Sequence, residues 1–405
     1  AEGNGEVVRQ DEIATWQEPS SPSGAHSRAY VVLAGRRGQD IADRLGLGDA
    51  RTAPSCLGCH STYAPANLRG DRFLLSDGVG CESCHGASQE WLPLHYGAAA
   101  THNSNLQAGL VPLEDPATRA NVCLDCHFGS EARGQFVTHS MMAAGHPRIS
   151  FELDLFSALQ QHHNFDLDYY DRKRVANSVQ MWAIGQAEAV RRSTSLFRKP
   201  EFATEGIFPQ LYFYDCHSCH RRIIDGPDQG WTFEKNPGRS IPFGNPPFND
   251  ENIIALSAIA SAIVPEKAET FLSASRAFHH AMAENYPAAQ DAAATLNQNA
   301  KELSEALASR QYDRNDAFRI IATIAGRVIS PSFTDYAGSV QAVMAIDTLM
   351  RSLVTSGRIT VGAAASIRSD INAAYEAVSD PNSYVPSAFR VALSSATRAI
   401  GALEE

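Results

Sequence analysis

Four copies of the pattern Cys-x-x-Cys-His restrict what this chain can fold into more than any other feature of its sequence. Within each copy the two cysteines are three positions apart, and a histidine follows the second cysteine directly. The cysteines are Cys56 and Cys59, Cys81 and Cys84, Cys123 and Cys126, and Cys216 and Cys219, and the histidines that follow are His60, His85, His127 and His220. All eight cysteines of the chain belong to these copies.

This pattern is typical of covalently attached haem c. The two thiols add to the vinyl groups of a porphyrin, and the adjacent histidine supplies an axial ligand to the iron. Zinc sites with thiolate ligands and disulfide bonds are the alternatives, because Cys-x-x-Cys pairs also occur in zinc ribbons. Neither alternative requires a histidine after every second cysteine, and only 14 of the 405 residues are histidine. The sequence therefore predicts four haem c groups with four proximal histidines.

Length and composition are those of an ordinary folded protein. The chain has 405 residues, of which 44% are hydrophobic and 20% charged, which is enough for two domains. No stretch approaches the roughly 18 apolar residues of a membrane span. Because haem c is attached on the far side of the bacterial cytoplasmic membrane, we expect Ala1 to be a processed mature end without a lipid anchor, and the protein to be periplasmic or secreted.

The formal net charge of −11 restricts the choice of partners. An acidic surface argues against nucleic acid and favours a basic redox partner protein that is attracted by electrostatic steering. The alternative interpretation is that the acidity serves solubility only.

The patterning predicts a mostly α-helical chain with two domains. Residues 1–247 are predicted to form an irregular, loop-rich multihaem c-type cytochrome domain, with a long helix over 173–197. Residues 248–405 have no cysteine and show helical spacing of apolar residues, interrupted by Pro and Gly. They are predicted to form an antiparallel bundle of six or seven helices. The boundary is placed in the Pro- and Gly-rich segment 226–247.

Histidines outside the motifs are candidates for the second axial ligand of each iron. His26 would lie in the first turn of a helix predicted over 25–34. His139 and His146 would project from nearly one face if a helix continues through Gly145. His217, inside the fourth motif, is predicted to point away from its own iron. The full set of distal candidates is His26, His95, His139, His146, His162 and His163.

The stretch from about His26 to His163 resembles the cytochrome c554 family of multihaem proteins. The most specific part is Gly-Val-Gly-Cys-Glu-Ser-Cys-His-Gly at 78–86, and weaker support comes from 25–29, 56–60, 123–127 and His95. The resemblance covers roughly a third of the chain and does not extend to the C-terminal helical region.

This resemblance implies closely packed haems that move electrons, most with two histidine ligands and one with a five-coordinate iron. The open iron would be that of the Cys56 and Cys59 haem. His26 would be the distal ligand of the Cys123 and Cys126 haem. The haem of Cys81 and Cys84 would take a distal histidine from further along the chain, which leaves His139, His146, His162 and His163 as candidates.

The chain departs from the family in the order of its motifs. In the family the first motif precedes the helix that here bears His26, whereas this chain has no cysteine before Cys56 and carries its fourth motif late, at Cys216. His95 matches the family residue that ligates the missing first haem. We therefore hypothesise that the Cys216 and Cys219 haem occupies that place and takes His95 as its distal ligand.

Three functions are compatible with these features, and the sequence favours the first. It is electron transfer between redox partners through four haems. The second is a redox enzyme in which an open iron at His60 acts on a small nitrogen or oxygen species, but no cluster of proton donors beside Cys56 identifies a catalytic residue. The third is a subunit of a larger electron-transfer assembly or filament, with the helical domain docking a partner or forming a homo-oligomer.

Overall fold

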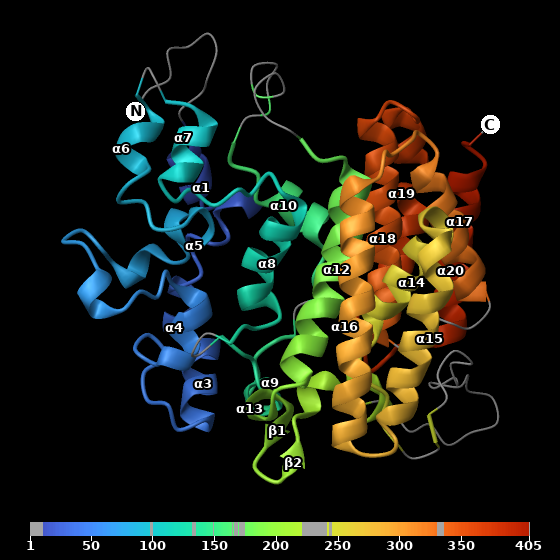
Figure 1. Ribbon diagram of the computed structural model, residues 1–405, viewed down its shortest axis with the longest axis horizontal. Coiled ribbons are helices and arrows are strands. Elements are labelled where there is room, and N and C mark those ends of the chain that lie inside the picture. The colour runs from blue at the N-terminus through green and yellow to red at the C-terminus, as the bar shows by residue number, and fades with distance from the viewer. Residues whose placement is uncertain are drawn as a thin grey trace. The chain divides into compact units, whose positions relative to one another are not determined.

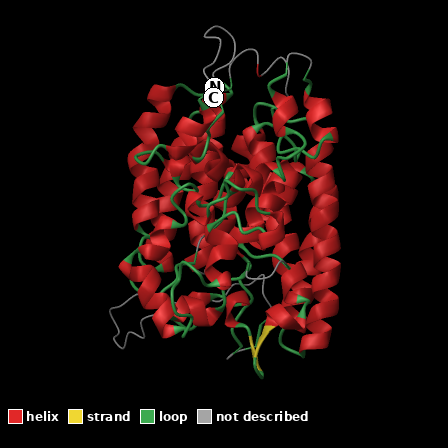
Figure 2. Ribbon diagram, turned by 90° about the vertical axis from the view of Figure 1, so that its left-hand side faces the viewer, coloured by secondary structure: helices red, strands yellow, loops and turns green. Residues whose placement is uncertain are grey.

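The structure is a computed structural model that describes residues 11–97, 100–131, 135–148, 150–163, 165, 169, 175–220, 241–242, 245–329 and 336–404. These residues are mostly helix and loop, with one short hairpin of strands β1 (Thr204–Glu205) and β2 (Phe208–Pro209), as Figure 2 shows. The mostly α-helical fold class is thereby confirmed.

The chain divides into two compact units. The first unit contains residues 1–149 and 155–176, and the second contains residues 150–154 and 177–405. The boundary predicted at 247 lies within the second unit, and most of the segment 226–247 falls outside the described residues. The domain limits drawn from the sequence therefore stay a prediction.

Short helices joined by turns make up the first unit. Its small core includes Leu33, Ala42, Ala50 and Leu57, and Leu57 is part of the first haem motif. The elements, labelled where there is room in Figure 1, are α1 (Glu12–Gln17), η1 (Pro22–Gly24), α2 (Val31–Ala34), α3 (Arg36–Arg44), α4 (Pro54–His60), η2 (Ala66–Leu68), η3 (Leu75–Asp77), α5 (Cys81–His85), α6 (Leu92–His95), α7 (His102–Gln107), α8 (Pro116–His127), α9 (His139–Ala143) and α10 (Leu153–Leu159), of which the last begins in the second unit.

Long helices packed side by side make up the second unit (Figure 1). Seven of them lie in the described part of residues 250–405, in agreement with the predicted six or seven. Pro265, Pro287 and Pro386 stand in the first turns of three of them, where a missing N–H costs no hydrogen bond. The helices are α12 (Ser178–Phe197), α13 (Pro200–Ala203), α14 (Glu251–Ile263), α15 (Pro265–Ala281), α16 (Tyr286–Ser309), α17 (Asp316–Ile329), α18 (Tyr336–Thr355), α19 (Val361–Glu376) and α20 (Pro386–Gly401), with the 3-10 turns η4 (Leu211–Phe213) and η5 (Cys216–Ser218) between α13 and α14.

Helix α12 is a largely buried helix of the second unit. It packs against α14, α16 and α18, and every side chain from Val179 to Val190 is buried. The sequence predicted this helix to begin at residue 173, but it begins at Ser178. Asn177 ends the preceding extended segment, and its side-chain oxygen accepts the backbone N–H of Val179, which is the usual way to start a helix.

The helix predicted over 25–34 is also shorter than expected. Residues 25–30 form successive turns, in which Ala29 donates to the carbonyl of His26 and Val31 to that of Arg28, and only 31–34 are α-helical. His26 therefore lies in a turn. Its carbonyl accepts a second hydrogen bond, from the backbone N–H of Val79 at 3.0 Å.

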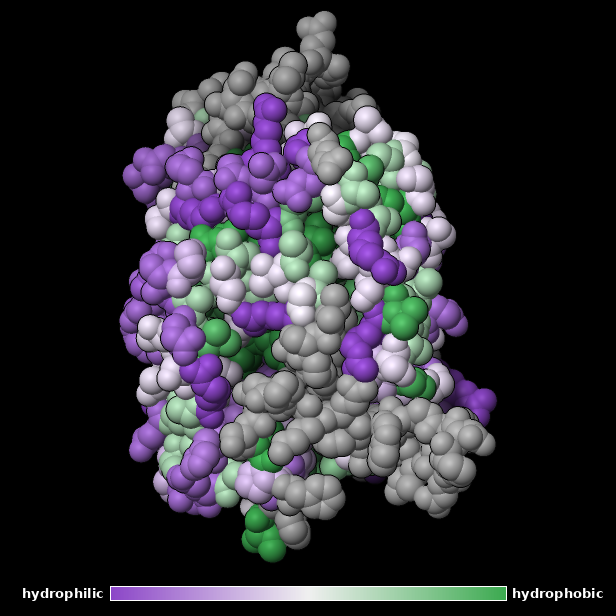
Figure 3. Space-filling view, turned by 90° about the vertical axis from the view of Figure 1, so that its right-hand side faces the viewer, coloured by the Kyte–Doolittle hydropathy of each residue, from purple (hydrophilic) through white to green (hydrophobic). Residues whose placement is uncertain are grey.

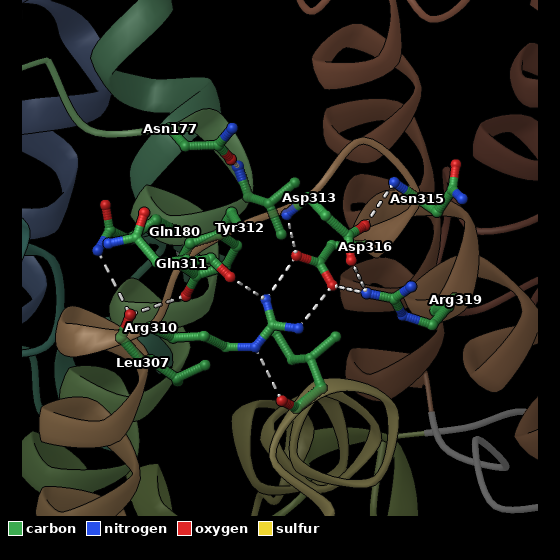
Figure 4. A network of polar contacts seen from close by, with 12 residues as sticks. Asn177, Gln180, Leu307, Arg310, Gln311, Tyr312, Asp313, Asn315, Asp316 and Arg319 are labelled. Carbon is green, nitrogen blue, oxygen red and sulfur yellow. Dashed lines mark hydrogen bonds and ion pairs between the residues drawn. The ribbon is translucent and has the colours of Figure 1, made fainter.

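A buried ion-pair network fixes the connection between α16 and α17 (Figure 4). The carboxylate of Asp316 is fully buried and accepts hydrogen bonds from Arg310 at 2.5 and 2.9 Å, and also from Arg319. Arg310 donates in addition to the carbonyl of Ile263, the last residue of α14. One carboxylate thus joins the start of α17 to two other helices.

The face of the second unit seen in Figure 3 carries hydrophilic and apolar residues in small areas that alternate. Single exposed apolar side chains such as Val361 and Val391 need no special explanation on a protein surface. Among the described residues, no helix combines the length and the hydrophobicity that a transmembrane span requires.

Candidate haem-binding site

The first three haem motifs each end a helix in the first unit. They are the last residues of α4, the whole of α5 and the last turn of α8. Residues three and four positions apart share a helix face. The two cysteines and the histidine of each motif therefore project to one side, which is the arrangement that covalent haem attachment requires.

His60, the histidine of the first motif, faces His146. Their ring centres are 6.3 Å apart and their planes are at 86° to each other. The Nδ1 of His60 donates to the carbonyl of Ala29 at 2.7 Å, and the Nδ1 of His146 to the carbonyl of Pro147 at 2.8 Å. Because a carbonyl can only accept, the proton of each neutral ring sits on Nδ1 and the Nε2 lone pair is left available as a ligand.

The end of α9 brings His146 to this place. The predicted helix through Gly145 does not form: α9 ends at Ala143, and Gly145 has a φ of +119°, which ends the helix. The N–H of Gly145 binds the carbonyl of Met142 and the N–H of His146 binds that of Met141, as in a Schellman motif. His139 and His146 are therefore not on one helix face.

Two arginines of α3 hold the same turn. Arg37 donates to the carbonyl of Gly145 at 2.7 and 3.0 Å, and Arg44 donates to the carbonyl of Ala144 at 2.8 Å. Cations are favourable at a helix C-terminus, where the carbonyls lack partners within the helix. The turn that bears His146 is thus fixed to α3.

His127, the histidine of the third motif, faces His26. Their ring centres are 6.4 Å apart at 85°. Phe156 packs against the His127 ring at 5.4 Å. The pairing of these two histidines is the one that the resemblance to cytochrome c554 implied.

His85, the histidine of the second motif, faces a pair of neighbours, His162 and His163. The ring centres of His85 and His162 are 6.3 Å apart at 87°, and those of His85 and His163 are 5.8 Å apart at 88°. His162 donates from Nδ1 to the carbonyl of Gln160 at 3.0 Å, whereas Nδ1 of His163 lies 3.7 Å from the carboxylate of Glu12. His162 therefore shares with His60 and His146 an Nδ1 that donates to a backbone carbonyl, which leaves Nε2 available as a ligand.

These three facing pairs fit an iron atom between them. A metal–imidazole bond of about 2 Å on each side, added to the distance from nitrogen to ring centre, separates two trans ring centres by about 6.4 Å. Burial lowers the pKa of His85 and His127 to about 4 and also lowers the pKa of His26 and His146. All four are thereby held neutral near pH 7, which is the form that binds metal.

The three motifs of the first unit also contact one another. The Sγ of Cys126, in the third motif, donates to the carbonyl of Gly58, between the cysteines of the first motif, at 3.9 Å. Thr62, two residues after the first motif, accepts the N–H of Gly80 at 2.7 Å and contacts the hydroxyl of Ser83 in the second motif at 2.8 Å. The three attachment segments therefore form one cluster.

The fourth motif lies in the second unit, over η5 and the two residues that follow it. The carboxylate of Asp215 accepts the N–H of Ser218 at 2.8 Å and starts η5. His217 is 4% exposed and lies 5.2 Å from the Tyr384 ring and 6.1 Å from the Tyr336 ring. His220 is exposed.

An aromatic cluster holds the residues just before the fourth motif. Phe213 is buried and packs on Phe197 at 5.6 Å and on Phe248 at 6.2 Å. Asp215 donates its backbone N–H to Pro247, and Asn249 donates to Phe213, so that the two segments pair locally. The helical bundle therefore supports this motif directly.

The two remaining candidates lie elsewhere in the first unit. His95 is exposed at the end of α6, where its Nδ1 donates to the carbonyl of Leu92 at 2.6 Å and its ring lies against Trp91 and Tyr96. His139 is the first residue of α9. Neither is part of the three facing pairs described above.

The zinc and disulfide alternatives find little support. All eight cysteines are free of disulfides. Within the described residues, the one set of three or more His, Cys, Asp or Glu ligand atoms spaced for a metal ion is His85, His162 and His163, and it contains no cysteine. A thiolate zinc site requires four such ligands, mostly sulfur.

Several residues that help to build this site belong to no sequence motif. Arg37, Arg44 and Thr62 act through backbone carbonyls and amides that are distant in sequence. Sequence reasoning missed them, because an arginine in an amphipathic helix and a threonine in a loop are common everywhere. A family alignment would be the signal that could have found them.

Comparison with known proteins agrees with this geometry for part of the chain. The family described as cytochrome c554 and c-prime matches residues 10–86, which include His26 and the first two haem motifs. No curated protein and no solved structure matches the chain. The match supports covalently bound haem c and a role in electron transfer. Residues 10–86 are therefore similar to the cytochrome c554 family.

Proposed function

We propose that this chain is a periplasmic or secreted tetrahaem c-type cytochrome that carries electrons between redox partner proteins. The observation that carries the proposal is the set of three histidine pairs. In each pair one member follows a Cys-x-x-Cys sequence, and the ring centres are separated by 6.3 or 6.4 Å. That spacing serves iron with two trans imidazole ligands.

The proposal assigns ligands to each haem. The haem of Cys56 and Cys59 takes His60 and His146, that of Cys81 and Cys84 takes His85 and His162, and that of Cys123 and Cys126 takes His127 and His26. The haem of Cys216 and Cys219 takes His220 as its proximal ligand, and His95 remains the distal ligand predicted from the sequence.

The protein's own part is to orient the imidazoles and to keep them neutral. When bound, haem supplies reversible one-electron chemistry at its iron. The carbonyls of Ala29, Pro147 and Gln160 each accept an Nδ1 proton and direct Nε2 of their histidine away from the backbone. A hydrogen bond from Nδ1 to a carbonyl fixes the tautomer of a ligating histidine and raises its basicity.

The site favours a carrier over a redox enzyme. Catalysis on a small nitrogen or oxygen species needs an open position on one iron. The resemblance to cytochrome c554 placed that position at the Cys56 and Cys59 haem, but His146 lies opposite His60. Exposed apolar side chains of the first unit, such as Leu68 and Leu74 at 71% and 60% exposure, fit a protein whose porphyrins replace part of its core.

The net charge of −11 supports redox partner proteins of basic charge, which it would attract electrostatically. The third function predicted from the sequence is a subunit of an assembly or filament, in which the helical unit docks a partner or forms a homo-oligomer. Light scattering of the purified protein after size exclusion tests it, because a strict monomer would remove the assembly.

The proposed function is tested by two measurements on the purified protein. Intact mass spectrometry is expected to show four added haems. The EPR spectrum of the oxidised protein, integrated for high-spin and low-spin ferric iron, is expected to show low-spin iron at the first three motifs. A high-spin signal that azide or cyanide converts to low spin would reveal an open iron. If that signal persists when Cys216 and Cys219 are replaced, the open iron belongs to one of the first three motifs, and the result favours a redox enzyme.

A further inference from the structure

Gln135 connects two haem-attachment segments that are far apart in sequence. Its Nε2 donates to the carbonyl of Gly58, between the cysteines of the first motif, at 3.2 Å. The same nitrogen donates to Sγ of Cys126, the second cysteine of the third motif, at 3.6 Å. Neither the sequence pattern nor the family match, which ends at residue 86, includes Gln135.

The orientation of this amide is fixed by Ser130. The Ser130 hydroxyl donates to Oε1 of Gln135 at 2.5 Å, and the Ser130 N–H donates to the backbone carbonyl of Gln135 at 2.8 Å. Ser130 is itself buried, with 8% exposure. With its oxygen occupied by Ser130, the amide presents its N–H groups to Gly58 and Cys126.

The first and third motifs also meet directly at the sulfur of Cys126. The Sγ of Cys126 lies 3.9 Å from the carbonyl oxygen of Gly58, to which the free thiol donates. Once both carry haem, each sulfur is a thioether that no longer donates but can still accept. The Cys126 thioether could then accept the hydrogen bond that the Gln135 amide donates.

We propose that Gln135 is a positioning residue that holds helices α4 and α8 together at the contact between the first and third motifs and donates a hydrogen bond to the Cys126 thioether. This inference rests on the proposed function. The N–H dipole directs its positive end to the haem of Cys123 and Cys126. Because a reduced haem carries one positive charge less, this dipole favours the reduced form, and hydrogen bonds to ligating or linking atoms are among the means by which proteins tune haem potentials.

The experiment is a potentiometric titration of the full holoprotein followed by EPR, for Gln135→Leu and Gln135→Glu. Leucine keeps most of the volume and removes the donors, whereas glutamate replaces the donors with a carboxylate. We expect the midpoint potential of one haem to fall in Gln135→Leu and to fall further in Gln135→Glu, with the other haems unchanged. We also expect the spin–spin broadening between two haems to weaken in both variants. Gln89→Leu is the matched control, since the Gln89 amide donates to Glu90 on the surface.

A second variant, Ser130→Ala, keeps the test decisive if the Gln135 variants lose haem. It leaves the amide in place but frees its orientation, and a smaller shift of the same haem is expected. No shift in any fully loaded variant, or an equal shift of all haems, would overturn the inference. The unaltered protein is measured first: if it lacks four haems, the proposed function fails, whereas failure of the variants alone leaves that function standing.

Discussion

The rings of His60 and His146 face each other at 6.3 Å and 86°, although one ends helix α4 and the other follows the turn after α9. A second histidine thus lies where the resemblance to cytochrome c554 implied an open coordination position. This relationship is the main reason to interpret the chain as a carrier, and it can be tested by substitution.

His146→Ala is expected to open one iron. One of the four proposed haems would lose its distal ligand, whereas its other ligand, His60, stays held by Ala29. We therefore expect about a quarter of the iron to change from low spin to high spin. Carbon monoxide binding to the reduced protein should appear in the visible spectrum. His139→Ala, at the other end of α9, is the control and should leave the spin state unchanged. An unaltered spectrum in His146→Ala would remove His146 as a ligand.

The choice between His162 and His163 can be made in the same way. We expect His162→Ala to perturb the low-spin EPR signal of one haem, because His162 has the 6.3 Å spacing and an Nδ1 fixed by Gln160. We expect His163→Ala to retain that signal, since its ring is closer to His85 at 5.8 Å and its Nδ1 lies near Glu12. The opposite result would exchange their roles.

Gly78→Ala is expected to disturb the contact between the second motif and the turn of His26. Gly78 has φ +73° and ψ −145°, and an added Cβ would lie 2.6 Å from the carbonyl oxygen of His26. We expect a loss of about 3 kcal/mol in unfolding free energy, measured by denaturant titration of the holoprotein.

Gly46→Ala is the matched control for that substitution. Gly46 also has a positive φ, +66°, but an added Cβ would meet no atom within 4 Å. The conformational cost alone is about 1 kcal/mol. Equal losses in the two variants would show that the contact with His26 contributes nothing.

Asp316→Asn is expected to destabilise the helical unit strongly. The substitution removes a fully buried charge that is bonded to Arg310 and Arg319, and breaking a buried pair from one side costs about 3 kcal/mol (Figure 4). Asp313→Asn is the control, because Asp313 is exposed and its pair with Arg319 lies at the surface, where such pairs contribute below about 1 kcal/mol. Its Oδ1 also accepts the N–H of Asn315, a bond that an asparagine oxygen can keep. Thermal unfolding followed by circular dichroism would compare the two, and similar melting temperatures would contradict the assignment.

His217→Ala should affect the fourth haem and no other. The buried His217 ring anchors η5 between Tyr336 and Tyr384. Its loss is expected to lower the occupancy of that haem in the intact mass spectrum, or to shift the potential of one haem, with three haems unchanged. His280→Ala is the control, since His280 is exposed and paired with Glu284. A change in all four haems would indicate general unfolding instead.

The proposed haem attachment could be predicted from the sequence alone, because attachment to a porphyrin depends on residues that are adjacent along the chain. Four Cys-x-x-Cys-His segments predict eight attachment thiols and four proximal histidines with no knowledge of the fold. The helical character of residues 250–405 could be predicted for the same reason, since helix periodicity and Pro or Gly interruptions are local properties.

Only the tertiary structure decided which histidines lie opposite the proximal ones. His146 and His162 reach their places through a turn at Gly145 held by Arg37 and Arg44, and through a carbonyl of Gln160. Six histidines remained distal candidates, because the residues next to a histidine do not determine what its ring will face. The contacts that orient it come from backbone atoms distant in the chain, and these meet only when the chain has folded.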